Sequence, residues 1–237
     1  MKVLAISDMH GNLDGLNLDG IDVAFLAGDI APLKGRGPWH VYDQIKWMKT
    51  TFKDWCEQWP NTKIVFVPGN HDFFPIAKDK FRVQLAGHDL NIDLAENAQM
   101  LIDSFTVVNG LQVYGTPWVP IISHSWAFEA ERDFLCQKFD LIPEGLDVLL
   151  THAPPHISRD DYIDVSIQWG GSEAFGSCEL AKYAFARNPR YLFCGHIHSG
   201  DHSKTDLGDV QCYNVSRVDE RYEIAYEPLI LDIEPHK

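Results

Sequence analysis

Five short apolar runs in this chain are each followed, within a few residues, by side chains of the kind that bind metal ions. The runs cover residues 3–6, 23–27, 64–67, 148–150 and 191–194. Short apolar runs that are bounded by turn residues predict buried β-strands. In an open α/β sheet, binding sites form just beyond the carboxyl ends of the strands. The pattern therefore predicts a single site to which five strand ends contribute.

The side chains in these clusters are carboxylates, imidazoles and one amide, without cysteine. The clusters are Asp8-Met9-His10, Gly28-Asp29, Gly69-Asn70-His71-Asp72, Thr151-His152 and Gly195-His196-Ile197-His198. A mixed oxygen and nitrogen set suits divalent ions such as Mn, Fe, Zn, Co or Ni and disfavours a structural thiolate site. The set is too large for one catalytic ion with an open position, and it fits two ions about 3.5–4 Å apart. Asp29 is the natural candidate to bridge such a pair.

Each cluster alone has an ordinary structural explanation. An Asp that follows Gly at a strand end is often a turn residue or a helix cap, and His152 could be a plain loop histidine. Gly-Asn-His-Asp and Gly-His-Ile-His are more specific, because they have no common structural role. The five clusters together, in this order and each after an apolar run, favour the metal site.

The same clusters resemble the motifs of the calcineurin-like metallophosphoesterase superfamily, which run D-x-H, G-D, G-N-H-[DE], H and G-H-x-H. All five are present in order between residues 8 and 198. Segments 113–118, 151–155 and 176–180 resemble the branch of metallophosphoesterase-domain phosphodiesterases. Protein serine/threonine phosphatases continue the second motif as G-D-x-x-D-R-G, whereas Asp29 is followed here by Ile-Ala-Pro-Leu-Lys. The sequence therefore disfavours that branch.

The resemblance implies a role for each ligand-type residue. One ion would be held by Asp8, His10 and His198, and the other by Asn70, His152 and His196. Asp29 would bridge the two ions, and a hydroxide shared by both ions would attack the phosphorus atom. His71 would stabilise the charge that builds up on the phosphate or protonate the leaving oxygen, unless it is only a structural support. Asp72 would orient His71 or cap a helix.

The substrate end of the site is less well specified. Trp118, Trp126 and Trp169 follow the motif segments and could stack on a nucleobase, although packing is the more common use of tryptophan at such a place. Arg159 is a cation in the loop after His152, where it would either clamp a phosphate or form a surface ion pair. Trp118 and Arg159 are the residues that we assign to substrate binding.

Composition limits the class of protein. The 237 residues fit one domain, 1–237, and the net charge of −14 disfavours binding to a nucleic-acid polymer. No apolar run approaches the roughly 18 residues of a membrane span, and residues 1–7 are too short for a signal peptide. The five cysteines are scattered and form no C-x-x-C pair, which indicates reduced thiols. We therefore expect a cytoplasmic protein that does not bind membranes.

Periodicity predicts the remaining elements. Residues 39–59 carry apolar side chains at steps of three and four, which predicts a helix whose aromatic residues face the core. Asn109-Gly110 predicts a hairpin with a type I′ turn, and residues 178–187 predict a helix that ends before Asn188-Pro189. Residues 210–215 and 229–233 predict strands. The expected fold class is α/β, a four-layer αββα sandwich of two mixed β-sheets flanked by helices, as the resemblance also implies.

The predicted function is a dinuclear-metal-dependent phosphoesterase that hydrolyses small phosphate esters, with phosphodiesters such as cyclic nucleotides preferred. The alternatives are a phosphomonoesterase or nucleotide-pyrophosphate hydrolase on the same site, and a non-catalytic scaffold that retains the fold. The expected cofactors are two divalent ions, with Mn²⁺ preferred over Fe, Zn, Co, Ni or Mg. The expected partner is a small phosphate ester such as a nucleotide, and the sequence leaves the oligomeric state open.

Overall fold

The computed structural model describes residues 1–156, 176–199, 202 and 204–235, and within them two large β-sheets carry the fold. The first sheet has the strand order β13-β1-β2-β3-β4. Its strands are β1 (Lys2–Ile6), β2 (Val23–Ala27), β3 (Lys63–Val67), β4 (Ala98–Met100) and β13 (Leu229–Asp232). Strands β1 to β4 are parallel and β13 is antiparallel to β1, so the carboxyl ends of β1, β2 and β3 share one edge.

The second sheet has the order β11-β12-β10-β9-β6-β5. Its strands are β5 (Ser104–Val108), β6 (Leu111–Thr116), β9 (Val148–Thr151), β10 (Tyr191–Cys194), β11 (Thr205–Leu207) and β12 (Val210–Asn214). The inner four are parallel, and β5 and β11 are antiparallel edge strands. Asn109 and Gly110 join β5 to β6 with φ of 49° and 88°, which confirms the predicted type I′ turn. A short pair, β7 (Val119–Pro120) and β8 (Glu129–Ala130), lies apart from both sheets.

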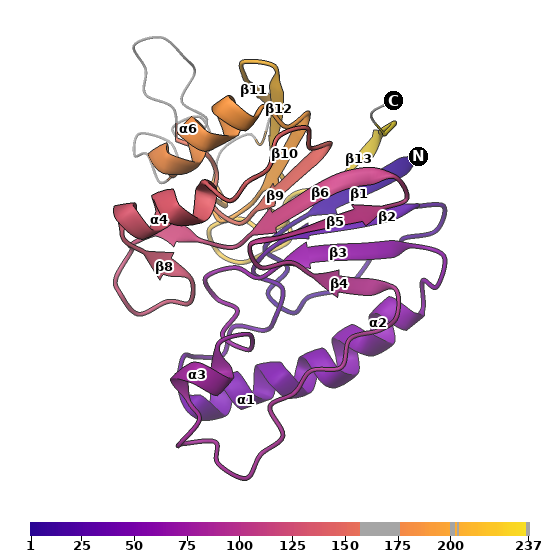
Figure 1. Cartoon of the computed structure of the whole chain (residues 1–237). Coiled ribbons are helices and arrows are strands. Elements are labelled where there is room, and N and C mark those ends of the chain that lie inside the picture. The colour runs from indigo at the N-terminus through magenta and orange to yellow at the C-terminus, as the bar shows by residue number, and fades with distance from the viewer. Residues whose placement is uncertain (157–175, 200–201, 203, 236–237) are drawn as a thin grey trace.

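The two sheets pack face to face with helices on their outer faces (Figure 1). Apolar side chains of both sheets fill the layer between them, and the rings of Phe25 and Phe193 stack across it at 5.8 Å. The first sheet is covered by α1 (Pro38–Trp47), η1 (Met48–Phe52), α2 (Lys53–Glu57) and α3 (Ala77–Lys80). The second is covered by α4 (Arg132–Phe139) and α6 (Cys178–Arg187). The predicted αββα sandwich is confirmed.

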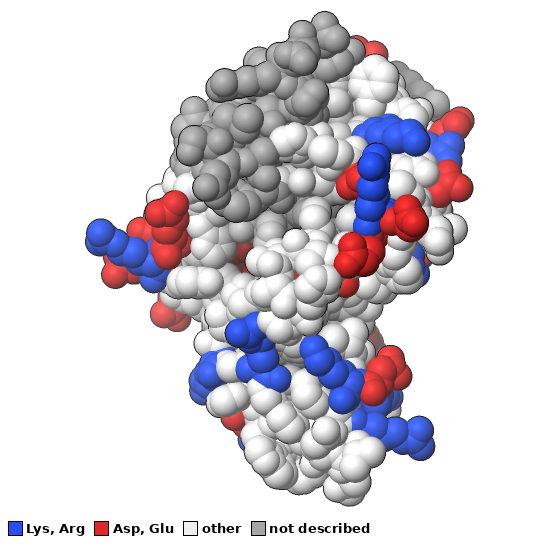
Figure 2. All heavy atoms as spheres, turned by 90° about the vertical axis from the view of Figure 1, so that its left-hand side faces the viewer, with Lys and Arg blue, Asp and Glu red and all other residues white. Residues whose placement is uncertain are grey.

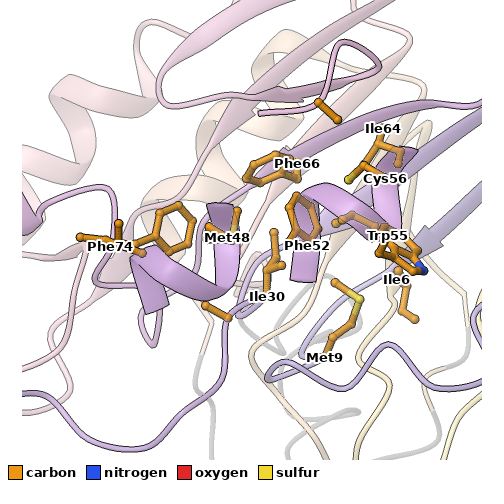
Figure 3. Packing of buried hydrophobic residues seen from close by; sticks show 14 of the residues in the cluster. Ile6, Met9, Ile30, Met48, Phe52, Trp55, Cys56, Ile64, Phe66 and Phe74 are labelled. Atoms are coloured by element: carbon orange, nitrogen blue, oxygen red, sulfur yellow. The ribbon is translucent and has the colours of Figure 1, made fainter. Parts of the chain in front are cut away.

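The predicted helix over residues 39–59 is present as a continuous helical segment made of α1, the π-helical turn η1 and α2. Its apolar stripe faces the first sheet, and Phe52 packs edge-on against Phe66 of β3 at 5.4 Å (Figure 3). The aromatic residues of the stripe are therefore core residues, as predicted. The predicted helix over residues 178–187 is α6, whose Leu180 amide donates to Ser177 Oγ and whose end has left-handed backbone at Asn188.

Two further expectations can be compared with the structure. All five cysteines are free thiols, as the scattered spacing predicted. Among the described residues no helix combines the length and apolar character that crossing a membrane requires. Helix α4 was not predicted, because its eight residues carry little apolar periodicity.

Candidate metal centre

The loops that follow the five predicted strands are joined to one another by hydrogen bonds from backbone amides to carbonyls or to the Asp8 and Asp29 carboxylates. The amide of Asp8 donates to the carbonyl of Gly28 at 3.0 Å, and that of His10 to the carbonyl of Asp29 at 2.9 Å. On the second sheet, the amide of Gly195 donates to the carbonyl of His152 at 2.9 Å. These bonds place the strand ends side by side, so all five clusters contribute to one buried site.

Asp29 lies at the centre of this site. Its Oδ1 is 3.3 Å from His152 Nε2, and its Oδ2 is 3.9 Å from His10 Nε2 and also 3.9 Å from His71 Nε2. The backbone amide of His71 donates to Oδ1 at 2.8 Å. Three imidazoles from both sheets therefore point a ring nitrogen at one carboxylate that is 1% exposed. This geometry supports the bridging role predicted for Asp29.

Asp8 is a second meeting point. Its Oδ1 is 3.2 Å from His198 Nε2, and the backbone amide of His196 donates to its Oδ2 at 3.0 Å. Asn70 Oδ1 is 2.9 Å from His152 Nε2, and the rings of His152 and His196 are 5.0 Å apart. Three groups of ligand atoms each lie within 4.8 Å of one another: Asp8, His10 and His198; His10, Asp29 and His71; and Asp8, Asp29 and His152.

The protonation pattern of the imidazoles fits metal binding. His152 Nδ1 is 2.9 Å from the carbonyl of Ala27, and His198 Nδ1 is 3.2 Å from the carbonyl of Asp219. A carbonyl accepts from Nδ1–H, so Nε2 is the nitrogen that would face an ion once its own proton is displaced. Both ring nitrogens of His10 are buried without a hydrogen-bond partner among the described residues. An unpaired buried polar atom is costly, and divalent ions would satisfy it, so the residues fit the ions that the motifs imply.

The buried carboxylates of the site are stabilised by nearby positive charge. Burial alone would raise the pKa of Asp8, but the hydrogen bond and charge of His198 outweigh it and lower that pKa well below its usual range. Burial would lower the pKa of His152, but the charge of Asp29 raises it to about 9. Burial lowers the pKa of His10 to about 4 and that of His196 to about 3, so both stay neutral. Neutral imidazoles beside ionised carboxylates are the forms that bind metal.

The backbone at the ligands is strained. Asp8, His10, Asp29 and His196 have φ between 44° and 73°, a region that side chains other than glycine rarely occupy. Such outliers cluster at functional sites, where the surrounding fold imposes them. A Cβ on Gly69 would collide with the Asp29 carboxylate, and one on Gly195 with that of Asp8. These contacts explain why glycine precedes Asn70 and His196.

His71 lies beside the ligands, and its ring is held from two sides. It stacks on Trp126 with ring centres 4.2 Å apart and planes at 26°, while its Nε2 faces Asp29. Gln44 of α1 donates to the carbonyl of His71 at 2.8 Å and accepts from the amide of Phe73 at 2.9 Å. The sequence analysis did not predict a role for Gln44, although a polar residue beside a buried helical stripe was a usable signal.

Asp72 does not take the predicted position beside His71. Its buried carboxylate accepts from the amides of Ile30, Ala31 and Gly69 at 2.8–3.1 Å. Within the described residues His71 Nδ1 has no hydrogen-bond partner, so the predicted orienting contact is wrong. Asp72 instead joins the loop of Asp29 to the loop of Asn70. Burial and the charge of Asp29 raise its pKa.

The two residues predicted to bind substrate have different outcomes. The indole N–H of Trp118 donates to Asp103 at 2.9 Å, and its ring packs edge-on against Phe128 and Phe134. The described contacts of Trp118 are therefore packing contacts, and its substrate role stays a prediction. Arg159 lies outside the described residues, as does Trp169.

Two aromatic residues next to the ligands had no motif to reveal them. Trp126 was named only as one of three tryptophans, and its stacking on His71 could not be seen in the sequence. Tyr222 lies with its ring centre 4.9 Å from that of His10 and 5.2 Å from that of His198. The carbonyl of Asp219 accepts from both His198 Nδ1 and the amide of Tyr222, so one turn fixes both rings.

Several known proteins are similar to this chain. Human metallophosphoesterase domain-containing protein 1 is 28% identical over 248 residues, which cover 98% of this chain and 71% of that protein. The 3′,5′-cyclic adenosine monophosphate phosphodiesterase CpdA of Escherichia coli K12 is 29% identical over 135 residues, or 56% of this chain and 42% of CpdA. The solved structure of TT1561 from Thermus thermophilus superimposes with a TM-score of 0.52 at 17% identity, covering 92% of this chain and 89% of that one.

The length of the match differs among relatives. A Caenorhabditis elegans UPF0046 protein is 38% identical over 146 residues, which cover 61% of this chain but only 35% of that protein. The model of one family, described as calcineurin-like phosphoesterase, matches residues 1–200 and so includes all five motifs. This chain belongs to the calcineurin-like phosphoesterase family.

Proposed function

We propose that this protein is a dinuclear-metal-dependent phosphoesterase that hydrolyses small phosphate esters and prefers diesters such as cyclic nucleotides. The observation that carries the proposal is the position of Asp29, whose two oxygens face His10 on one side and His152 on the other. Asp8 and His198 stand with His10, and Asn70 stands with His152. The chain thus offers two ligand groups that share one carboxylate.

Asp8, His10 and His198 would hold one ion, Asn70, His152 and His196 the other, and Asp29 both. When bound, such ions neutralise phosphate charge and make a water molecule nucleophilic at neutral pH. Manganese is the proposed metal because the ligand set mixes hard oxygens with imidazoles. We also propose a cytoplasmic location, which the free cysteines favour.

His71 is the residue proposed to act on the leaving group. Its ring is 9% exposed, lies beside Asp29 and is held by Trp126, so it is positioned without being a member of either proposed ligand set. Burial lowers its pKa, which the charge of Asp29 opposes. Such an imidazole can give a proton to the departing oxygen or donate a hydrogen bond to a phosphoryl oxygen.

The diester preference rests on two observations. The loop after Asp29 lacks the D-R-G continuation of protein phosphatases, and CpdA, a relative over 56% of this chain, is named a cyclic-nucleotide phosphodiesterase. A second candidate, phosphomonoesterase activity, is favoured by Arg36, a cation over Trp126 that the sequence had not placed near the site. A monoester dianion carries more charge than a diester and benefits from such a group.

The test is a hydrolysis panel with Mn²⁺ and a metal count on the purified protein. The panel compares bis-p-nitrophenyl phosphate, p-nitrophenyl phosphate, and 2′,3′- and 3′,5′-cyclic nucleotides. We expect two ions per chain and a higher kcat/KM for diesters than for matched monoesters. A monoester preference across several leaving groups would favour phosphomonoesterase activity. No hydrolysis of any ester with both metal sites loaded would favour a non-catalytic scaffold.

A further inference from the structure

Three flat groups extend outward from the metal centre in a stack. The ring of His71 stacks on the indole of Trp126, and the guanidinium carbon of Arg36 lies 4.1 Å from the Trp126 ring centre. Arg36 belongs to the loop between β2 and α1, the same loop that begins at Asp29. The stack therefore links a cation, through the indole of Trp126, to the one residue proposed to act on the leaving group.

The middle of this stack is anchored. Glu129 accepts from the amides of Ile122, Ser123 and Trp126 at 2.7–2.9 Å, which fixes the loop that carries the indole. The amide of Ala127 donates to the carbonyl of Asn70 at 3.0 Å, so this loop is also tied to a proposed metal ligand. Trp126 thus has a fixed place relative to the site, and Arg36 rests on a fixed surface.

Arg36 has no carboxylate partner among the described residues, in a chain with 34 acidic and 20 basic residues. Other arginines do have one: Arg132 pairs with Glu179, Arg187 with Asp140 and Arg190 with Asp147. Arg36 instead donates a hydrogen bond to the neutral hydroxyl of Ser125. Stacking uses the face of a guanidinium and leaves its in-plane N–H groups free to bind the two oxygens of a carboxylate or phosphate.

The surroundings of the stack favour an anion despite the acidic composition. Figure 2 shows several Lys and Arg side chains over the lower end of the molecule, the part that carries α1 and α3, with some acidic side chains among them. Segment 78–82 alone holds Lys78, Lys80 and Arg82 against Asp79. Lys46, Lys49 and Lys53 at this end pair with aspartates, so segment 78–82 supplies the local excess of positive charge, which raises the local concentration of anions.

We propose that Arg36, seated on Trp126, forms a subsite for a second anionic group on the substrate. This inference rests on the proposed function, because it places that group on the leaving-group side of the phosphate, next to His71. The substrate class is then a phosphate ester whose departing alcohol carries a carboxylate or a second phosphate. Either group presents the paired oxygens that a guanidinium binds with two hydrogen bonds.

The test uses methyl aryl phosphate diesters with three leaving groups: 3-carboxy-4-nitrophenolate, 3-phospho-4-nitrophenolate and the neutral 3-carbamoyl-4-nitrophenolate. The measured quantity is the ratio of kcat/KM for each anionic ester to kcat/KM for the carbamoyl ester. Differences in the intrinsic reactivity of the esters cancel when this ratio is compared between variants. We expect Arg36→Gln to lower this ratio about 10-fold, the worth of a partly exposed charge-assisted hydrogen-bond pair. A loss confined to the phospho ester would identify a second phosphate, and a loss for both would identify any paired oxyanion.

Lys34→Gln is the matched control, because Lys34 is an exposed cation two residues away in the same loop. A ratio that falls equally in Lys34→Gln would indicate only a diffuse field, and a ratio unchanged in Arg36→Gln would contradict the subsite directly. Arg36→Lys keeps the charge without the planar fork, so we expect it to recover only part of the ratio. Thermal unfolding of the three variants checks that each is folded.

A binding measurement separates this proposal from the proposed function. Calorimetry on the Mn²⁺-loaded protein compares 4-carboxybenzylphosphonate with 4-carbamoylbenzylphosphonate, neither of which can be hydrolysed. We expect the carboxylate to bind about 10-fold more tightly in the wild type and equally in Arg36→Gln. Equal affinities in the wild type would contradict the subsite while the function stands. If neither phosphonate binds and no ester is hydrolysed, the proposed function falls and the subsite with it.

Discussion

The two sheets contribute different chemistry to the one site. The loops of the first sheet supply both carboxylates, Asp8 and Asp29, together with the Asn70 amide and His10. The loops of the second sheet supply imidazoles only, from His152, His196 and His198. The two buried carboxylates of the first sheet repel each other. The imidazoles of the second sheet carry no negative charge that would attract a cation.

Contacts across the sheets therefore complete the site. His198 lies 3.2 Å from Asp8 and His152 lies 3.3 Å from Asp29, so each carboxylate of the first sheet faces an imidazole of the second. The core between the sheets, where Phe25 stacks on Phe193, sets the distance at which these pairs meet. The site therefore depends on how the two sheets pack, because neither half alone supplies all of its ligand-type residues.

The largest expected effect comes from removing the charge that both halves share. Asp29→Asn should abolish phosphoesterase activity, a loss of at least about 10³-fold, and weaken binding at both metal sites, because Asp29 faces imidazoles from both sheets. Metal analysis of the purified variant, together with initial rates, measures both effects. Asp54→Asn, at an exposed residue of α2, is the control that should leave both unchanged. Loss of only one ion in Asp29→Asn would contradict bridging.

The next effect concerns a residue of the first sheet's loops that we expect to leave the metals in place. His71→Ala should lower kcat by about 10²–10⁴-fold with metal content unchanged, because His71 is proposed to act on the leaving group. His88→Ala, at an exposed histidine on the outer surface, should retain full activity.

The choice of substrate separates the two roles of His71. An activated leaving group such as p-nitrophenolate needs little protonation, so a general acid at His71 predicts a smaller defect with it than with an alkoxide. An equal defect with both would indicate charge stabilisation alone. Loss of metal together with activity would make His71 a ligand or a structural support.

A smaller effect is expected from the histidines of the metal-free protein. The pKa of His10 is lowered to about 4 and that of His196 to about 3, from 6.5. Between pH 6.5 and these lowered values, both imidazoles bind protons in the unfolded chain but stay neutral in the folded protein. Their contribution to stability is therefore complete above pH 6.5 and is lost as pH falls. Each residue should cost on the order of 1–2 kcal/mol of unfolding free energy between pH 7 and 5.

His152 acts in the opposite direction. Its pKa is raised to about 9, so its stabilisation is complete below pH 6.5 and is lost as pH rises through 9, which offsets part of the loss at pH 5. Urea unfolding of the chelated protein at pH 7 and 5 measures the net change, to which Asp72, with a pKa raised to about 7, also contributes. His196→Gln should show a smaller difference between the two pH values than the wild type, and an equal difference would contradict the assignment.

The sequence predicted the parts of this site that depend on local pattern. Apolar runs located the five strands, and the ligand-type residues after them lie together, because parallel strands bring their carboxyl ends to one edge. Asn109-Gly110 located a turn whose φ values only such residues adopt readily. The unpredicted features depend on contacts between distant segments. Arg36 and Trp126 are 90 positions apart, and no spacing indicates that they stack.

Asp72 illustrates the same limit within a motif. Its place directly after His71 suggested a contact with that ring, but the carboxylate accepts hydrogen bonds from two amides of the Asp29 loop and from the Gly69 amide of its own loop. Those amides lie at strand ends, where backbone donors have no partner in a sheet. A buried acceptor that pairs with these amides stabilises the fold more than one that orients His71. The sequence does not reveal which backbone donors lack a partner.

The smallest expected effect tests Trp118, the residue that sequence reasoning assigned to substrate. Trp118→Phe keeps a ring to pack against Phe128 and Phe134, but this ring is smaller than the indole and lacks the N–H that donates to Asp103. Asp103 also accepts from Thr116 and pairs with Lys138, so the loss should destabilise the fold by about 1 kcal/mol. Because these contacts are all made within the fold, kcat/KM for cyclic nucleotides and for the chromogenic diester should change less than about twofold. Denaturant unfolding and parallel rates measure the pair, and a loss selective for nucleotides would return Trp118 to the substrate site.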